Sequence, residues 1–208
     1  MTTHSRRSIQ TVVFDLGKVL VDFDYGIAAR KIAAQSKMPV TELGRFLLSA
    51  PVLLRYEMGL LTTEQFYQAI CAGAGFSGNL EEFGTTFADI FWPIQPMVEL
   101  HSALRQQSIP TYIFSNTNEL AVRHIRRNFP FFANFDGYIL SYEHGAMKPD
   151  SKLYEVVERE SGRRGAEILY LDDRPENIEA GEARGWQVIL QESPEKTQAT
   201  LRGLGLLK

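Results

Sequence analysis

The segment Val12-Val13-Phe14-Asp15-Leu16-Gly17 runs from three apolar residues into an aspartate and then a glycine. A short apolar run that ends in this way is typical of a buried strand whose carboxyl end carries an acidic side chain, and the glycine permits a turn. Open α/β sheets bind their ligands at the carboxyl ends of their strands. Asp15 is therefore the first candidate for a reactive group.

The part of the chain after residue 96 alternates between strand and helix patterns. We expect strands at residues 12–14, 111–114, 137–140, 168–171 and 187–190, with helices at residues 97–104, 120–129, 153–157, 178–184 and 194–206. Near-continuous apolar strands separated by helices predict a parallel sheet with helices on both faces. The predicted fold class is therefore α/β.

Between residues 24 and 95 the pattern is helical. Apolar residues recur at helical spacing around residues 27–32, 43–47, 52–56, 63–71 and 83–91. The segment Trp92-Pro93-Ile94-Gln95-Pro96 carries two prolines, which we expect to end one helix and start the next. The prediction is an α/β core made of residues 1–23 and 96–208, with a small helical insert at residues 24–95.

Composition excludes several classes of partner. The net charge of −3 provides no basic field for nucleic acid, and no window approaches the apolar length of a membrane span. The single cysteine, Cys71, has no partner for an internal disulfide, which fits a reducing compartment. The segment Ser5-Arg6-Arg7-Ser8 superficially resembles a twin-arginine export signal, but charged residues interrupt the apolar stretch behind it. We therefore expect a cytoplasmic protein.

Polar and charged residues follow four of the predicted strands. They are Asp15, Ser115-Asn116, Lys148 in the loop after its strand, and Asp172-Asp173. In a parallel sheet these residues lie along one edge. The predicted site thus contains three carboxylates, a hydroxyl, an amide and an ammonium group.

Three neighbouring carboxylates repel one another unless a cation lies among them. Oxygen ligands without histidine or thiolate favour Mg²⁺, which commonly binds carboxylates together with substrate phosphate oxygens. We expect the pair Asp172 and Asp173 to bind the metal, although the sequence does not say which of the two is the direct ligand. We expect Ser115, Asn116 and Lys148 to hold phosphate. Asp15 would bind the metal and attack phosphorus to form an aspartyl-phosphate.

These residues resemble the four motifs of the haloacid dehalogenase-like hydrolase superfamily, whose members are mostly phosphatases. The motifs are Asp15-Leu16-Gly17-Lys18-Val19, Ser115-Asn116, Lys148-Pro149-Asp150, and Asp172-Asp173 followed by Asn177. Each motif is short, but the four occur in order and span almost the whole chain. The first motif, with Val21-Asp22-Phe23-Asp24 behind it, is similar to the alpha-D-glucose-1-phosphate phosphatase subgroup.

The resemblance implies a Rossmann-like core, a mobile helical cap over the site, and Mg²⁺-dependent hydrolysis of small phosphoesters. It also implies that the backbone carbonyl of Gly17 binds the metal and that Asn177 supports the ligands from behind. Specificity would lie in cap side chains, for which the candidates are Phe46, Arg55, Tyr56 and Glu57. The sequence leaves the substrate open, and the oligomeric state is either monomer or homodimer.

Gly17 departs from the family pattern. Most phosphatases of the superfamily carry at this position an aspartate that protonates the leaving group, a contribution of roughly 10²- to 10⁴-fold in rate. We therefore expect a preference for good leaving groups, such as anomeric, acyl or aryl phosphates. Asp22 and His144 are further donors to consider, although a structural role suits each of them better.

Two alternatives remain at this point. A 2-haloacid dehalogenase uses an aspartate to attack carbon without a metal, but Asp172 and Asp173 would then form an uncompensated acidic cluster beside Asp15. A protein that binds a phosphoryl ligand, and has lost turnover together with the general acid, is the second alternative.

Overall fold

A computed structural model describes residues 9–49 and 51–207 of the chain. The arginine pair of the possible export signal lies outside the described residues. Within them, no helix combines the length and the apolar composition that crossing a membrane requires.

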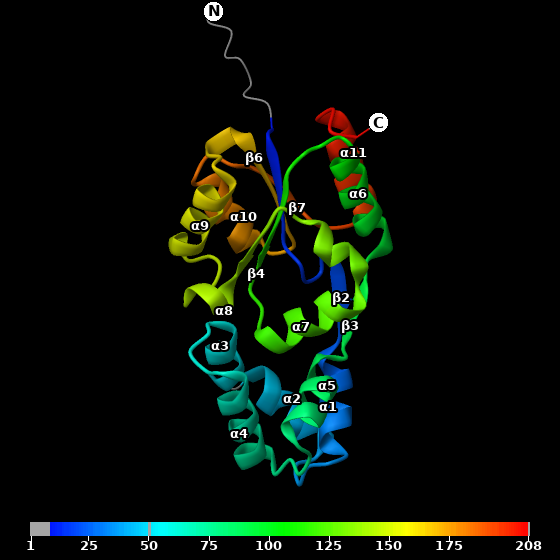
Figure 1. Ribbon diagram of the computed structural model, residues 1–208, viewed down its shortest axis with the longest axis vertical. Coiled ribbons are helices and arrows are strands. Elements are labelled where there is room, and N and C mark those ends of the chain that lie inside the picture. Colours follow the sequence, from blue (N-terminus) through cyan, green and yellow to red (C-terminus); the bar gives the residue numbers. More distant parts are fainter. Residues whose placement is uncertain (1–8, 50, 208) are drawn as a thin grey trace, which may run out of the picture.

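Five parallel strands form the central sheet. They are β1 (Thr11–Phe14), β4 (Thr111–Ser115), β5 (Gly137–Leu140), β6 (Ile168–Asp172) and β7 (Gln187–Leu190), in the order β5-β4-β1-β6-β7. All neighbouring strands pair in parallel, which confirms the predicted sheet. Because β1 is central, Asp15 follows the strand that lies between β4 and β6 (Figure 1).

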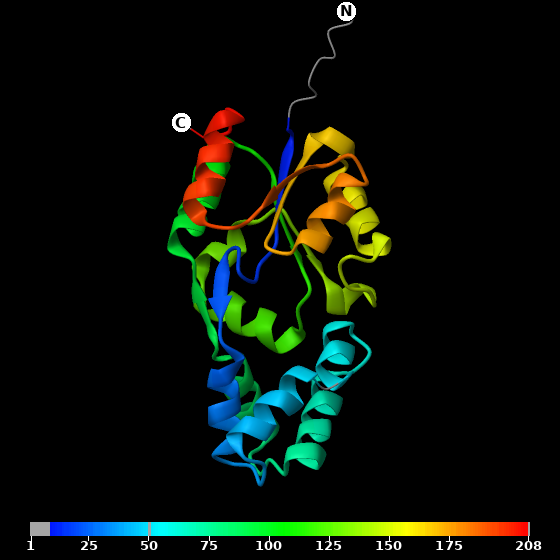
Figure 2. The ribbon, with the colours of Figure 1, turned by 180° about the vertical axis from the view of Figure 1, so that it is seen from behind.

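Helices cover both faces of this sheet. Val12 and Phe14 face a core shared with α6 (Gln95–Gln106), α7 (Glu119–Asn128) and α11 (Pro194–Gly203). Val13 faces the opposite core, which α9 (Ser151–Ser161) and α10 (Pro175–Glu182) complete. Figure 2 shows the two helical layers on either side of the strands. The strands are apolar on both faces for this reason, as the sequence pattern predicted.

Short helical segments complete the core. They are η1 (Pro130–Asn134), α8 (Ser141–His144) and η2 (Gly165–Glu167).

A separate helical unit lies beyond the carboxyl ends of the strands (Figure 1). Its helices are α1 (Tyr25–Ala33), α2 (Val40–Ser49), α3 (Pro51–Glu57), α4 (Thr63–Ala74) and α5 (Leu80–Ala88). The unit has its own apolar core, in which the ring of Phe66 contacts those of Tyr56, Phe83 and Phe87. Local chemistry sets its helix ends: Asp24 caps α1, and Thr62 forms a capping box with Gln65 at the start of α4.

The connection between the helical unit and the core differs from the prediction. The helix expected to include Ile90 and Phe91 ends at Ala88, and β3 (Phe91–Pro93) pairs antiparallel with β2 (Val21–Phe23). The rings of Phe23 and Phe91 lie 5.8 Å apart across this ladder. The helical pattern is overridden because the aromatic rings pair across the two strands. The edge position also tolerates the proline in β3. The two chain crossings into and out of the helical unit lie side by side.

Candidate active site

The carboxyl ends of β1, β4 and β6 meet at one cavity of about 380 Å³. Asp15, Gly17, Ser115, Asn116, Lys148, Asp173 and Asn177 all line it. The sheet order explains this convergence, because the adjacent strands β4, β1 and β6 end at the same edge. Of the residues that the sequence predicted for the site, Asp172 lies just behind the cavity wall and is fully buried.

Lys148 is the buried cation of the site. Its Nζ lies 2.9 Å from Asp15 Oδ1 and 2.6 Å from Asp172 Oδ2, and it donates to the carbonyl of Phe114 at 2.9 Å. These three contacts use all three N–H donors of the ammonium group. Burial alone would lower the pKa of Lys148, but the two carboxylates outweigh it and raise this pKa above its ordinary value. Lys148 therefore stays charged.

Asp172 is saturated with hydrogen bonds from protein donors. Besides Lys148, it accepts from the Tyr170 hydroxyl, from Asn177 Nδ2 at 3.0 Å and from the Arg174 backbone N–H at 2.8 Å. Burial tends to raise the pKa of Asp172, but Lys148 and the other donors hold it below its ordinary value. Asp172 is thus an ionised group that positions Lys148 and Asn177.

Asp15 and Asp173 have fewer protein partners. Burial raises the pKa of Asp15 to about 7, with Lys148 opposing this shift and Asp172 adding to it. Burial and the charge of Asp172 also raise the pKa of the half-buried Asp173. Raised acid pKa values are expected where negative charge is only partly compensated.

The donor set fits a divalent cation. One carboxylate oxygen from each of Asp15, Asp172 and Asp173 lies within 4.8 Å of the others. Lys148 pairs with two of these carboxylates, Asp15 and Asp172, and none of the described residues that line the cavity is a histidine or a cysteine. Hard oxygen donors with excess negative charge suit Mg²⁺.

The end of β4 supplies polar groups on the opposite side of Asp15. Ser115 is almost fully buried, and its hydroxyl has only a long contact of 3.4 Å, to the Asn116 carbonyl. Both polar atoms of the Asn116 side chain are hydrogen-bonded to the backbone of Lys148. Asn118 caps α7 by accepting from the Ala121 N–H, so the helix begins beside the cavity.

The helical unit and β2–β3 form the roof of the cavity. Phe23, Tyr25, Glu57 and Phe91 line it from this side. Among the four cap residues considered for specificity, only Glu57 lines the cavity within the described residues. The hydroxyl of Tyr56 instead lies 3.2 Å from the Leu120 backbone N–H, which donates to it.

Sequence reasoning missed several lining residues. Thr117, Asn118 and Arg174 follow predicted motifs by one to three positions, so proximity to those motifs was an available signal. Tyr25 comes from the helical unit and carried no such signal. The two alternative proton donors lie elsewhere: Asp22 accepts from the Phe23 N–H and pairs with Lys18, and neither Asp22 nor His144 lines the cavity.

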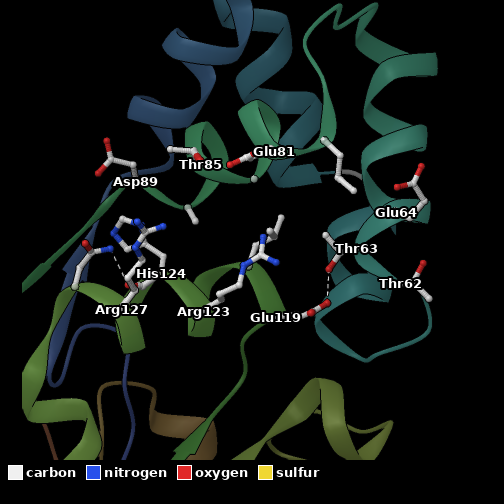
Figure 3. A pocket seen from close by; sticks show the side chains of 15 residues that line it. Thr62, Thr63, Glu64, Glu81, Thr85, Asp89, Glu119, Arg123, His124 and Arg127 are labelled. Carbon is white, nitrogen blue, oxygen red and sulfur yellow. Dashed lines mark hydrogen bonds between the residues drawn. The ribbon is translucent and has the colours of Figure 1, made fainter.

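A larger pocket of about 1000 Å³ lies between the helical unit and α7 (Figure 3). Charged side chains line it, with Arg123 and Arg127 on α7 and Glu64 and Asp89 on the helical unit. Thr63 donates to Glu119 across one end, as Figure 3 shows. None of the strand-end residues reaches this pocket, so the smaller cavity is the candidate active site.

Comparison with known proteins agrees with this geometry. The family model described as haloacid dehalogenase-like hydrolase matches residues 9–185. A sesquiterpene phosphatase, astK of Aspergillus oryzae, is 24% identical over 86% of this chain and 87% of its own length. D-ribitol-5-phosphate phosphatase of Bacteroides thetaiotaomicron is 23% identical over 89% of this chain and 93% of its own length.

Some of the similar structures were solved with ligands. The HAD family enzyme bt-2542 from Bacteroides thetaiotaomicron, in complex with magnesium and inorganic phosphate, has a TM-score of 0.77 and 20% identity. The match covers 88% of this chain and 93% of that one. The overall α/β architecture of the two chains is therefore the same.

Proposed function

Because the chain belongs to the haloacid dehalogenase-like hydrolase family, we propose that it is a Mg²⁺-dependent phosphatase of small phosphorylated metabolites. One observation carries this proposal: Asp15 and Asp173 line the same cavity, while Lys148 bridges Asp15 to Asp172 behind it. A nucleophile, a cation site and a phosphate-binding ammonium group are thereby combined in one small space.

We assign the metal to Asp15, the backbone carbonyl of Gly17, and Asp173. The saturated hydrogen bonding of Asp172 supports Asp173 as the direct ligand of the acidic pair, with Asp172 and Asn177 behind it. When bound, Mg²⁺ would neutralise the excess carboxylate charge and the charge of the transferring phosphoryl group. The bt-2542 enzyme, which has the same fold, was solved in complex with magnesium and inorganic phosphate, and this supports magnesium as the metal.

Asp15 attacks phosphorus with one carboxylate oxygen, and the bond to the leaving oxygen breaks. Lys148, Ser115 and the backbone N–H group of Asn116 hold the phosphoryl oxygens during this step. Water then hydrolyses the aspartyl-phosphate, which releases phosphate and restores Asp15. The lysine keeps its charge throughout, because two carboxylates favour its protonated form.

We propose that residues 24–95 act as the cap of a core formed by residues 1–23 and 96–208. The paired strands β2 and β3 would be the hinge, because both chain crossings pass through them. The roof residues Tyr25 and Glu57 support this role, since they close the cavity opposite the strand ends.

The cavity volume favours a small substrate. A volume of about 380 Å³ lies near the lower end of the range for ligand pockets. Aromatic rings and hydrogen-bonding groups line the roof together, which suits a phosphorylated sugar or polyol. The relatives named for sesquiterpene and ribitol phosphates show that both kinds of leaving group belong in a screen.

The test is a screen of phosphorylated metabolites, including α-D-glucose 1-phosphate and ribitol 5-phosphate, with wild type and Asp15→Asn in parallel. We expect phosphate release that requires Mg²⁺, stops on chelation and is absent in Asp15→Asn. Chloride release from 2-chloropropionate that survives chelation would instead establish the dehalogenase. Ligand-induced stabilisation without any product in the wild type would establish a binding protein.

A further inference from the structure

The cavity contains no side chain at position 17 to protonate a leaving group. A Cβ built on Gly17 would lie 3.0 Å from Cε1 of Phe23, so the aromatic ring occupies the space into which a side chain would extend. A proton donor, if the chain has one, must therefore come from another element.

The titratable residues that line the cavity are the candidates for this proton donor. Asp15, Asp173 and Lys148 are already assigned to the nucleophile, the metal and the phosphate. Of the remaining four, Lys18 pairs with Asp22, and Arg174 pairs with Glu176. Burial and the neighbouring Glu57 raise the pKa of Tyr25 far above its ordinary value, so its proton is held too tightly. Glu57 remains.

The surroundings of Glu57 suit a carboxyl group that exchanges a proton near neutral pH. Burial raises its pKa to about 7, and hydrogen bonds from the side chains of Asn118 and Tyr25 only partly oppose this shift. The Asn118 carbonyl oxygen accepts from the Ala121 N–H, which leaves its amide nitrogen to donate to Glu57. The charged groups that share the cavity with Glu57 are Lys18, Arg174 and the strand-end cluster.

The backbone of Glu57 is attached to the phosphate-binding loop. Its carbonyl accepts a hydrogen bond from the Ser141 hydroxyl at 2.6 Å, and Ser141 Oγ in turn accepts from the Thr117 backbone N–H at 2.9 Å. Thr117 follows Ser115 by two residues, so α3 is held against the loop at the end of β4. Glu57 therefore lines the cavity from the roof, and Asp15 and Ser115 line the same cavity from the strand ends.

We propose that Glu57 is the proton donor to the leaving group, in place of the aspartate that is absent at position 17. As Asp15 attacks, the phosphorus–oxygen ester bond breaks, its electron pair stays on the leaving oxygen, and the proton of the Glu57 carboxyl group moves to that oxygen. The resulting Glu57 carboxylate then takes a proton from the water that attacks the aspartyl-phosphate. This inference rests on the proposed phosphatase function.

The first test compares leaving groups in Glu57→Gln and wild type. We expect the variant to lose roughly 10²- to 10⁴-fold in kcat on an alkyl phosphate and less than about tenfold on 4-nitrophenyl phosphate, whose leaving group needs no proton. Wild type should show only a weak dependence of rate on leaving-group pKa. A steep wild-type dependence, unchanged in the variant, would overturn the proposal and support the preference for good leaving groups that Gly17 suggested.

The second test is the pH profile of kcat on the alkyl phosphate. Wild-type activity should fall as pH rises through about 7, because Glu57 loses its proton, and this limb should be absent in Glu57→Gln. Tyr25→Phe removes a hydrogen bond that favours the carboxylate, so it should move the limb to higher pH. If Glu57 has only a structural role, the shape of the pH profile will be the same in wild type and in both variants. A limb that stays in place in both variants would therefore contradict the assignment.

Glu42→Gln serves as the control, because Glu42 is an exposed glutamate of the same helical unit. It should match wild type on both substrates. Absence of Mg²⁺-dependent hydrolysis in wild type on every phosphoester would overturn the phosphatase function and this inference together. The role of Glu57 alone would be overturned if wild type hydrolyses phosphoesters, Asp15→Asn does not, and Glu57→Gln is as active as wild type on both substrates.

Discussion

The side chain of Asn116 clamps the backbone of Lys148 from both sides. Asn116 Oδ1 accepts from the Lys148 N–H at 2.7 Å, and Asn116 Nδ2 donates to the Lys148 carbonyl at 3.0 Å. The residue after β4 thereby fixes the loop after β5. Asn116 thus positions the backbone of Lys148, and Asp172 positions its ammonium group.

Replacing Asn116 by alanine should therefore displace Lys148. We expect a loss of roughly 10²-fold in kcat, because a small misplacement of a positioning group is costly in a preorganised site. Steady-state kinetics on the best substrate of the screen provide the measurement. Asn128→Ala is the matched control, since Asn128 is an exposed asparagine that only donates to the His124 carbonyl; equal losses in both variants would refute the clamp.

Lys148→Met should destabilise the protein as well as inactivate it. Removing this cation from the buried cluster leaves Asp15 and Asp172 uncompensated, which we expect to lower the free energy of unfolding by about 3–5 kcal/mol at pH 7 without Mg²⁺. The loss should be smaller at pH 5, because protonation then removes carboxylate charge. Urea unfolding at both pH values measures this. Lys152→Met, at an exposed position of α9, should change stability little, and a pH-independent loss in Lys148→Met would be inconsistent with the charge argument.

Asp172→Asn and Asp173→Asn should affect stability in different ways. Asp173→Asn should abolish most of the stabilisation by Mg²⁺, which for the wild type is about 2.7 kcal/mol when Mg²⁺ is at 100 times its dissociation constant. Asp172→Asn should instead lower stability even without Mg²⁺, because Lys148, Tyr170 and Asn177 lose an ionised partner. Thermal unfolding with and without Mg²⁺ separates the two variants. Interchanged phenotypes would assign the direct ligand to Asp172.

In the metal-free protein, Asp15 and Glu57 should each lower the free energy of unfolding as pH rises from about 5 to 7, whereas His101, whose pKa is lowered to about 4 by burial, acts in the opposite sense. The pKa values of Asp15 and Glu57 are about 7 in the folded protein and near 4 when unfolded, so the folded state binds more protons in this window. Each group then lowers the free energy of unfolding by up to roughly 1.4 kcal/mol per pH unit. Asp15→Asn and Glu57→Gln should each reduce the slope in urea titrations. An equal slope in the wild type and in both variants would show that neither pKa is raised.

The sequence determined the sheet and the strand-end cluster. Apolar runs that end in Asp15, Ser115 and Asp172 are local signals, and parallel strand ends must share an edge, so the three residues could be brought together without coordinates. Capping residues such as Thr62 and Asp150 also act over one helical turn, and the structure shows both as helix caps.

Only the tertiary structure decided how these groups divide their roles. Asp172 and Asp173 are neighbours in sequence, yet one is enclosed by donors from four other residues and the other lines the cavity. The strand β3 was missed because its pairing with β2 spans almost the whole helical unit in sequence, and no local pattern encodes such a contact. Glu57 was one of four candidates until folding placed α3 against Ser141. The burial of a side chain, the number of its hydrogen-bond partners and its proton affinity depend on contacts between segments that are distant in the sequence. A local sequence pattern does not contain these contacts.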